Sequence, residues 1–214
     1  MIRFARAILL IAAFGLLSAA SLRADTLLSN LGQSFGGITG VGLATSRIAT
    51  DFLTDGSDAT ITGATLRLIN QDNVAHTVTV SLWSDSGSGS PGTLLGSFVP
   101  ISIPGNGGGL INQSFSSAGI GLEANSAYWV VMQINEDANA NAVSWQYTVS
   151  GAADAGSVYS LIPATRTQFS GDSGDTWLDD LPANFQFSLL PEPDGFAQLG
   201  AGVLALLLLR RHKP

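Results

Sequence analysis

The chain has 214 residues, a formal net charge of −7 and no cysteine. Without cysteine there are no disulfides, no thiol catalysis and no thiolate metal sites, and two histidines leave little for a zinc or copper site. The acidic balance repels nucleic acid and anionic lipid headgroups, so we do not expect a nucleic-acid partner.

Residues 1–24 are typical of a secretory signal peptide. They hold basic residues near the start, an apolar run over residues 7–17 and a small-x-small motif for cleavage. Cleavage after Ala20 and cleavage after Ala24 both fit this pattern. We therefore expect export through the Sec machinery.

Residues 25–190 predict one all-β domain. The apolar run Tyr128–Ile134 is typical of a central strand covered on both faces. Other segments alternate apolar and polar residues with period two, which predicts one face on a core and one toward solvent; they include Leu66–Leu68, Val78–Leu82, Val143–Val149 and Phe185–Leu189. Turn-rich stretches separate them, and we expect eight or nine strands in a two-sheet β-sandwich of jelly-roll type.

The charge of this domain is more one-sided than that of the whole chain. Between residues 25 and 190 there are fourteen acidic residues against three basic ones, a formal charge of −11. The other six basic residues lie in the two ends of the chain. The domain itself is therefore strongly acidic.

Several segments of the domain resemble the choice-of-anchor R family. The strand and turn Val80–Gly87, the loop Pro91–Gly96 and the later strand Leu122–Val131 are similar to segments of that family, and Leu28–Leu31 matches its opening. The resemblance implies placement at the cell surface. It implies no catalytic residues, so none is assigned.

Residues 191–214 combine three features in order: the tripeptide Pro191-Glu192-Pro193, an uncharged apolar run over residues 195–209, and the basic residues Arg210, Arg211 and Lys213. The two prolines predict an extended tripeptide that suits a protease cleft. The apolar run predicts a helix of ~22 Å, shorter than the ~30 Å hydrocarbon core. This length favours temporary retention in the membrane, with the basic end on the cytoplasmic side.

This tail resembles the PEP-CTERM sorting signal of bacterial proteins. The resemblance implies processing by exosortase, a membrane-embedded transpeptidase-like enzyme, near Pro191-Glu192-Pro193. An ordinary C-terminal membrane anchor with a proline-rich hinge is the alternative.

The sequence Gly171-Asp172-Ser173-Gly174 resembles the segment around the nucleophile of chymotrypsin-like serine proteases, and Ala75-His76 faintly resembles their histidine segment. A catalytic triad needs the base within hydrogen-bond reach of the serine. Asp175 stands where that family has a second glycine, so we expect a polar surface turn and an exposed histidine instead. A secreted hydrolase using Ser173 and His76 is the remote alternative.

Acidic residues surround Trp177, and they make a candidate calcium site: Asp172, Asp175, Asp179 and Asp180. Calcium takes six to eight oxygen ligands, which four carboxylates and backbone carbonyls can supply. A weaker candidate set is Asp51, Asp55 and Asp58. Acidic loops are commonly just solvated, which is the alternative for both sets.

Tryptophans offer candidate stacking platforms for a glycan. We expect Trp145 in the core and Trp129 in the most buried strand, whereas Trp83 has the parity of an outward-facing residue and Trp177 lies in an acidic loop. An exposed large apolar side chain calls for an explanation. Trp83 and Trp177 are therefore the candidate glycan contacts, unless a loop or the second sheet covers them.

Together these features predict a non-enzymatic, exported protein of a Gram-negative bacterium. Its expected partners are the Sec machinery, the inner membrane for a limited time, exosortase and extracellular polysaccharide. We expect a structural or adhesive role at the cell surface or in the biofilm matrix. A carbohydrate-binding module is the main alternative.

Overall fold

The computed structural model describes residues 26–192 except 106, 108 and 163–166. Every regular element in this part is a β-strand, which confirms the all-β prediction. The described residues belong to one compact unit, Asp25–Glu192. No helix in this part is long and apolar enough to cross a membrane. The expected signal-peptide helix and C-terminal helix lie outside the described residues.

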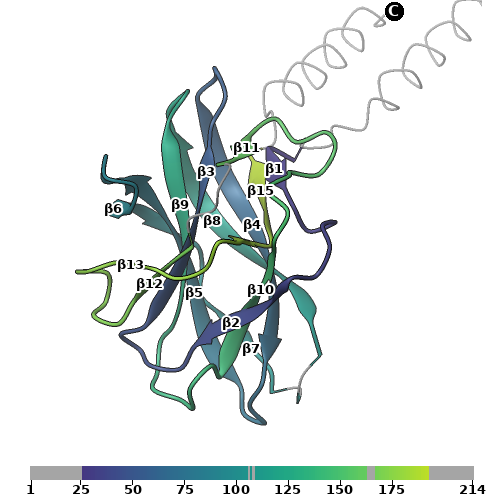
Figure 1. The fold of residues 1–214 in the computed structure, drawn as a ribbon, viewed down its shortest axis with the longest axis vertical. Helices are drawn as coiled ribbons and strands as arrows, with labels where there is room; N and C mark the ends of the chain where they lie inside the picture. The colour runs from purple at the N-terminus through teal and green to yellow at the C-terminus, as the bar shows by residue number, and fades with distance from the viewer. Residues whose placement is uncertain (1–25, 106, 108, 163–166, 193–214) are drawn as a thin grey trace, which may run out of the picture. The chain divides into compact units, whose positions relative to one another are not determined.

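The strands form two sheets in which all pairings are antiparallel (Figure 1). The first sheet has seven strands: β1 (Leu28–Ser29), β2 (Gly37–Val41), β4 (Ala59–Asn70), β8 (Ile111–Leu122), β10 (Val143–Thr148), β14 (Asn184–Phe185) and β15 (Phe187–Pro191). The second sheet has eight strands: β3 (Arg47–Leu53), β5 (His76–Asp85), β6 (Pro91–Ser97), β7 (Ile101–Ile103), β9 (Ala127–Ile134), β11 (Ser160–Leu161), β12 (Thr167–Ser170) and β13 (Leu178–Asp179).

The two sheets contain more strands than the eight or nine predicted, so that prediction was wrong. The additional strands arise because one edge of a long strand pairs with two shorter strands, one after the other. Strand β4 pairs with β8 along one edge, while β15 and then β10 pair along the other. In the second sheet, β9 lies between β3 and β5, and β11 and β12 share the outer edge of β3. The predicted central strand is therefore confirmed as β9.

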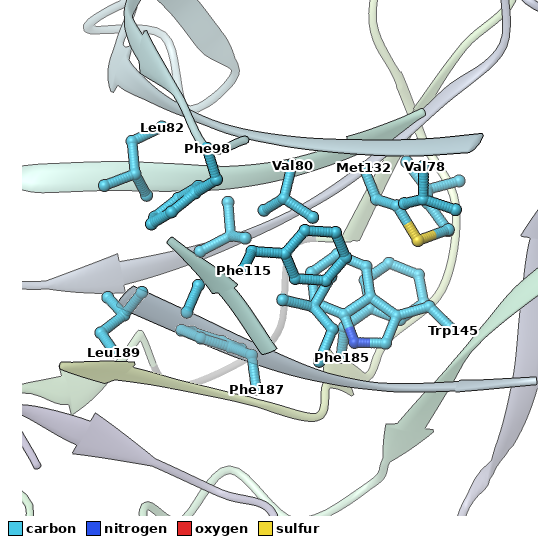
Figure 2. Close-up of a cluster of buried hydrophobic side chains, with 14 of the residues drawn as sticks. Val78, Val80, Leu82, Phe98, Phe115, Met132, Trp145, Phe185, Phe187 and Leu189 are labelled. Atoms are coloured by element: carbon cyan, nitrogen blue, oxygen red, sulfur yellow. The ribbon is translucent and has the colours of Figure 1, made fainter. Parts of the chain in front are cut away.

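The main core lies between the two sheets. Figure 2 shows side chains of β5 and β9 on one side and those of β10, β14 and β15 on the other, with aromatic rings between them. The rings of Trp145 and Phe185 stack with centroids 4.6 Å apart. Phe187 meets Trp145 edge-on and also contacts Phe52. The prediction that Trp145 belongs to the core is confirmed.

Polar residues expected to face solvent are buried on the outer face of the first sheet. Ser144, Gln146 and Thr148 of β10 are all buried, although period-two alternation predicted exposure. The chain before β2 covers this face, since the Gln186 amide donates to the backbone carbonyls of Asn30 and Gln33 at 3.1 and 2.7 Å. A second layer over a sheet face is invisible to the alternation of a single strand.

We predict that the aromatic core dominates stability. Phe187→Ala removes a fully buried ring and should lower the free energy of unfolding by about 3–5 kcal/mol. Phe35→Ala is the matched control, because that ring is 63% exposed and its loss should cost less than about 0.5 kcal/mol. Denaturant unfolding of both variants measures the difference, and equal losses would contradict this account of the core.

Candidate functional site

Trp83 and Trp177, the two predicted glycan contacts, meet on the outer face of the second sheet. Their ring centroids are 6.1 Å apart, and the rings are nearly perpendicular at 79°. Both side chains are partly buried, because each covers part of the other. The two residues come from β5 and from the segment before β13, and the fold brings them together.

A second, small apolar cluster lies beneath these two rings. It consists of Ala49, Trp129 and Val131, which are buried on the face opposite the main core. The indole of Trp129 donates a hydrogen bond to Asp85 at 3.0 Å. The burial expected for Trp129 is confirmed, but the cover comes from the turn between β12 and β13 and not from the other sheet.

That turn is held by hydrogen bonds to one carboxylate. Asp172 accepts bonds from the backbone N–H and the hydroxyl of Thr176, at 2.9 and 2.6 Å, and from the hydroxyl of Ser170 at 2.8 Å. The backbone N–H of Ser173 donates to the carbonyl of Thr45 at 2.9 Å. These bonds fix the turn against the start of β3.

The backbone conformation favours a glycine in the turn beside Arg47. Gly174 has a φ of 90°, and a Cβ built there would lie 2.7 Å from a guanidinium nitrogen of Arg47. The Arg47 Cζ lies 5.3 Å from the ring centroid of Trp83, a cation–π distance. Burial lowers the pKa of Arg47, and the charge of Asp175 opposes this shift. Arg47 therefore supports Trp83 from the side of the turn.

A groove of about 730 Å³ lies beside Trp177. We call it the Trp177 groove; it is lined by Ser88–Ser90, Thr167, Gln168 and residues 177–182. The Gln168 amide nitrogen lies 3.1–3.2 Å from the Gly89 carbonyl, the Ser90 hydroxyl and the Asp179 carboxylate. This amide joins the two walls of the groove, formed by the β5–β6 turn and the β12–β13 hairpin.

Two polar atoms at the Trp177 groove are buried and have no hydrogen-bond partner among the described residues: Oε1 of Gln168 and Nε1 of Trp177. Buried polar groups are nearly always bonded, and an unmade bond costs about 1–3 kcal/mol. The sequence had singled out Trp177 but not Gln168, because nothing in the local pattern distinguishes this glutamine from a solvent-facing strand residue.

The predicted calcium ligands do not converge. Among the residues described, no three His, Asp or Glu side chains are grouped so that they hold a metal ion. Asp172 is engaged within its own turn, and Asp179 accepts a bond from Gln168. In the second set, Asp51 is buried on β3, while Asp55 and Asp58 cap nearby backbone N–H groups.

The serine and histidine of the hydrolase alternative do not form a catalytic pair. His76 is 5% exposed, so the prediction of an exposed histidine was wrong. Its Nε2 lies 2.9 Å from Asp72 and its Nδ1 lies 3.2 Å from Glu136. Carboxylates therefore take both ring nitrogens, and neither bonds Ser173.

The predicted sorting tripeptide begins inside the last strand. Pro191 ends β15, and its carbonyl accepts a bond from the Thr62 hydroxyl at 3.0 Å. The backbone N–H of Glu192 donates to the carbonyl of Thr60 at 2.9 Å. The remaining predicted residues of the tail lie outside the described part of the chain: Pro193, Arg210, Arg211 and Lys213.

Comparisons with known proteins do not assign a function to this chain. No protein-family model matches the chain, and the search of curated proteins found no match. The case for any function therefore rests on the sequence features and the contacts described above.

We predict that the β12–β13 turn loosens in acid through Asp172. Bonds from Thr176 and Ser170 lower the pKa of Asp172 from 3.8 to about 2. Because the folded pKa is the lower one, these bonds stabilise the folded state above about pH 4, and the contribution is lost as the pH falls toward 2. The difference in unfolding free energy between wild type and Asp172→Asn should therefore narrow between these pH values.

Denaturant unfolding followed by tryptophan fluorescence measures this difference, since Trp177 follows the turn directly. Thr176→Val removes the hydroxyl donor and should show a weaker pH dependence than wild type. A difference between wild type and Asp172→Asn that stays constant from pH 4 to pH 2 would contradict the assignment.

Proposed function

We propose that this chain is an exported surface protein of a Gram-negative bacterium, sorted through a PEP-CTERM tail at residues 191–214. In this proposal the tail holds the exported protein in the inner membrane until exosortase cuts near Pro191-Glu192-Pro193. The released domain, a jelly-roll sandwich of the choice-of-anchor R kind, then serves a structural or adhesive role in the cell envelope or polysaccharide matrix. It carries out no catalysis.

One observation supports this proposal most directly: the compact unit ends within the tripeptide, at Glu192. Strand β15 is an inner strand, paired with β1 on one edge and with β4 on the other. Its last ladder contacts involve Pro191, and Glu192 makes one further bond to β4. A cut beyond Glu192 therefore leaves the hydrogen bonds of the sheet intact and the domain folded.

The same contacts favour one side of the tripeptide for the cut. A protease holds its substrate as an extended strand through backbone hydrogen bonds. The backbone groups of Pro191 and Glu192 are already bonded to Thr62 and Thr60. To bind the peptide bond before Glu192, exosortase would have to break the hydrogen bonds between the end of β15 and β4. We therefore expect the cut to follow Glu192 or a later residue.

The test is the intact mass of the mature protein from wild-type cells and from cells without exosortase. In wild-type cells we expect a C-terminus at residue 192 or shortly after it. In cells without exosortase we expect a chain that keeps Lys213 and stays in the membrane fraction. The same spectra locate the N-terminus at Ser21 or Asp25.

Each result bears on a different part of the proposal. A wild-type protein that still contains Lys213 would refute processing altogether. A C-terminus at Pro191 or earlier would keep exosortase processing but refute protection by the sheet. The same cut in cells without exosortase would assign the processing to another protease.

A further inference from the structure

We propose that the Trp177 groove binds a neutral carbohydrate chain. Its lining combines an indole, hydroxyl groups, an amide and two carboxylates, a mixture that matches the alternating C–H and O–H surfaces of a sugar. The groove belongs to the second sheet, and its described lining includes no residue after Pro182. Glycan binding in the groove is therefore independent of sorting through the tail. It would also give an adhesive role a physical basis.

The first requirement is a rigid apolar platform. Trp177 is partly exposed at the groove, and the edge-on contact with Trp83 holds it from behind. Arg47 and the side-chain-free Gly174 complete this support. Because the ring is already fixed, binding a sugar against it costs little side-chain entropy. Leu178, which is 66% exposed, extends the apolar surface.

The second requirement is a set of acceptors and donors for sugar hydroxyls. Asp179 and Asp180 bring carboxylates to the groove, and Ser88 and Ser90 bring hydroxyls. The Thr167 hydroxyl is already bonded to the backbone of Leu181. Hydrogen bonds to a carboxylate are short and strong. Burial raises the pKa of Asp180, although the residue as a whole stays exposed at the rim of the groove.

Two buried polar atoms at the groove point to a missing partner. Gln168 is 3% exposed, and its amide oxygen has no hydrogen-bond partner among the described residues. The indole nitrogen of Trp177 likewise has none there. One atom is an acceptor and the other is a donor. A sugar hydroxyl both donates and accepts, so a bound carbohydrate would give each atom its missing bond once a small side-chain shift brings that atom to the groove surface.

Charge narrows the class of carbohydrate. The described lining residues include two carboxylates and no basic side chain. The domain around them carries a formal charge of −11 between residues 25 and 190. Uronic acids, sulfated sugars and phosphates would meet repulsion at close range. The charge around the groove therefore points to a neutral carbohydrate chain.

The test is titration of the full chain, purified in a detergent without a sugar headgroup, with neutral hexaoses of glucose, mannose and galactose. A hexauronate of the same length is the acidic comparison. Tryptophan fluorescence and calorimetry report binding. We expect saturable binding of at least one neutral hexaose and at least tenfold weaker binding of the hexauronate.

Variants locate the site. Trp177→Ala should weaken binding at least tenfold, and its matched control Phe35→Ala removes another exposed ring and should leave binding unchanged. Asp179→Asn/Asp180→Asn should weaken binding severalfold with the fold intact. Asp55→Asn/Asp58→Asn makes the same change of charge elsewhere and should have no effect.

Melting curves check that each variant folds, and the double asparagine variant keeps the test valid where Trp177→Ala does not fold. The proposal is overturned when none of the neutral hexaoses binds saturably. It is also overturned when binding survives both groove variants, or when the hexauronate binds as tightly as the neutral chains.

Discussion

Burial of aromatic and aliphatic side chains between the two sheets is the interaction on which this domain depends. The chain has no cysteine, so no covalent cross-link limits the unfolded state. The stacked rings of Trp145 and Phe185, with Phe187 and Phe52 beside them, join strands that are far apart in the sequence. Because β14 has only two residues, its position depends on this packing more than on its own ladder.

The sandwich has more than two layers where its outer faces are covered. On the first sheet, the chain before β2 bonds to Gln186 and buries the polar residues of β10. On the second sheet, the turn between β12 and β13 covers Trp129 and presents Trp177. Both covers are held by polar bonds to backbone or carboxylate groups. The candidate site exists because the second cover leaves a groove along its edge.

Sequence reasoning succeeded where a strand carries its own signal. The run Tyr128–Ile134 identified β9, and the parity of Trp83 and Trp145 separated an outer residue from a core residue. It failed where the outcome depends on another segment. His76 is buried because Asp72 and Glu136 enclose it, and Gln168 reaches the groove because β12 pairs with β3. Neither contact leaves a trace in local periodicity.

Local spacing alone also makes the aspartates around Trp177 a candidate metal site, which the folded turn does not form. These aspartates are close in the sequence, but the chain reverses at Ser173 and Gly174, which both have positive φ. Their carboxylates therefore do not gather into one site among the described residues. Asp172 is then consumed by the turn, while Asp179 and Asp180 reach the groove. Of the four aspartates, Asp172 therefore builds the platform, whereas Asp179 and Asp180 line the groove.

The two proposals concern different sheets of the domain. The chain leaves the folded unit from β15, a strand of the first sheet, whereas the groove lies on the outer face of the second sheet. A cut after Glu192 therefore removes no residue that the structure places in the lining of the groove. Because the core lies between β15 and the groove, we expect a cut after Glu192 to leave Trp177 and the residues that support it unchanged.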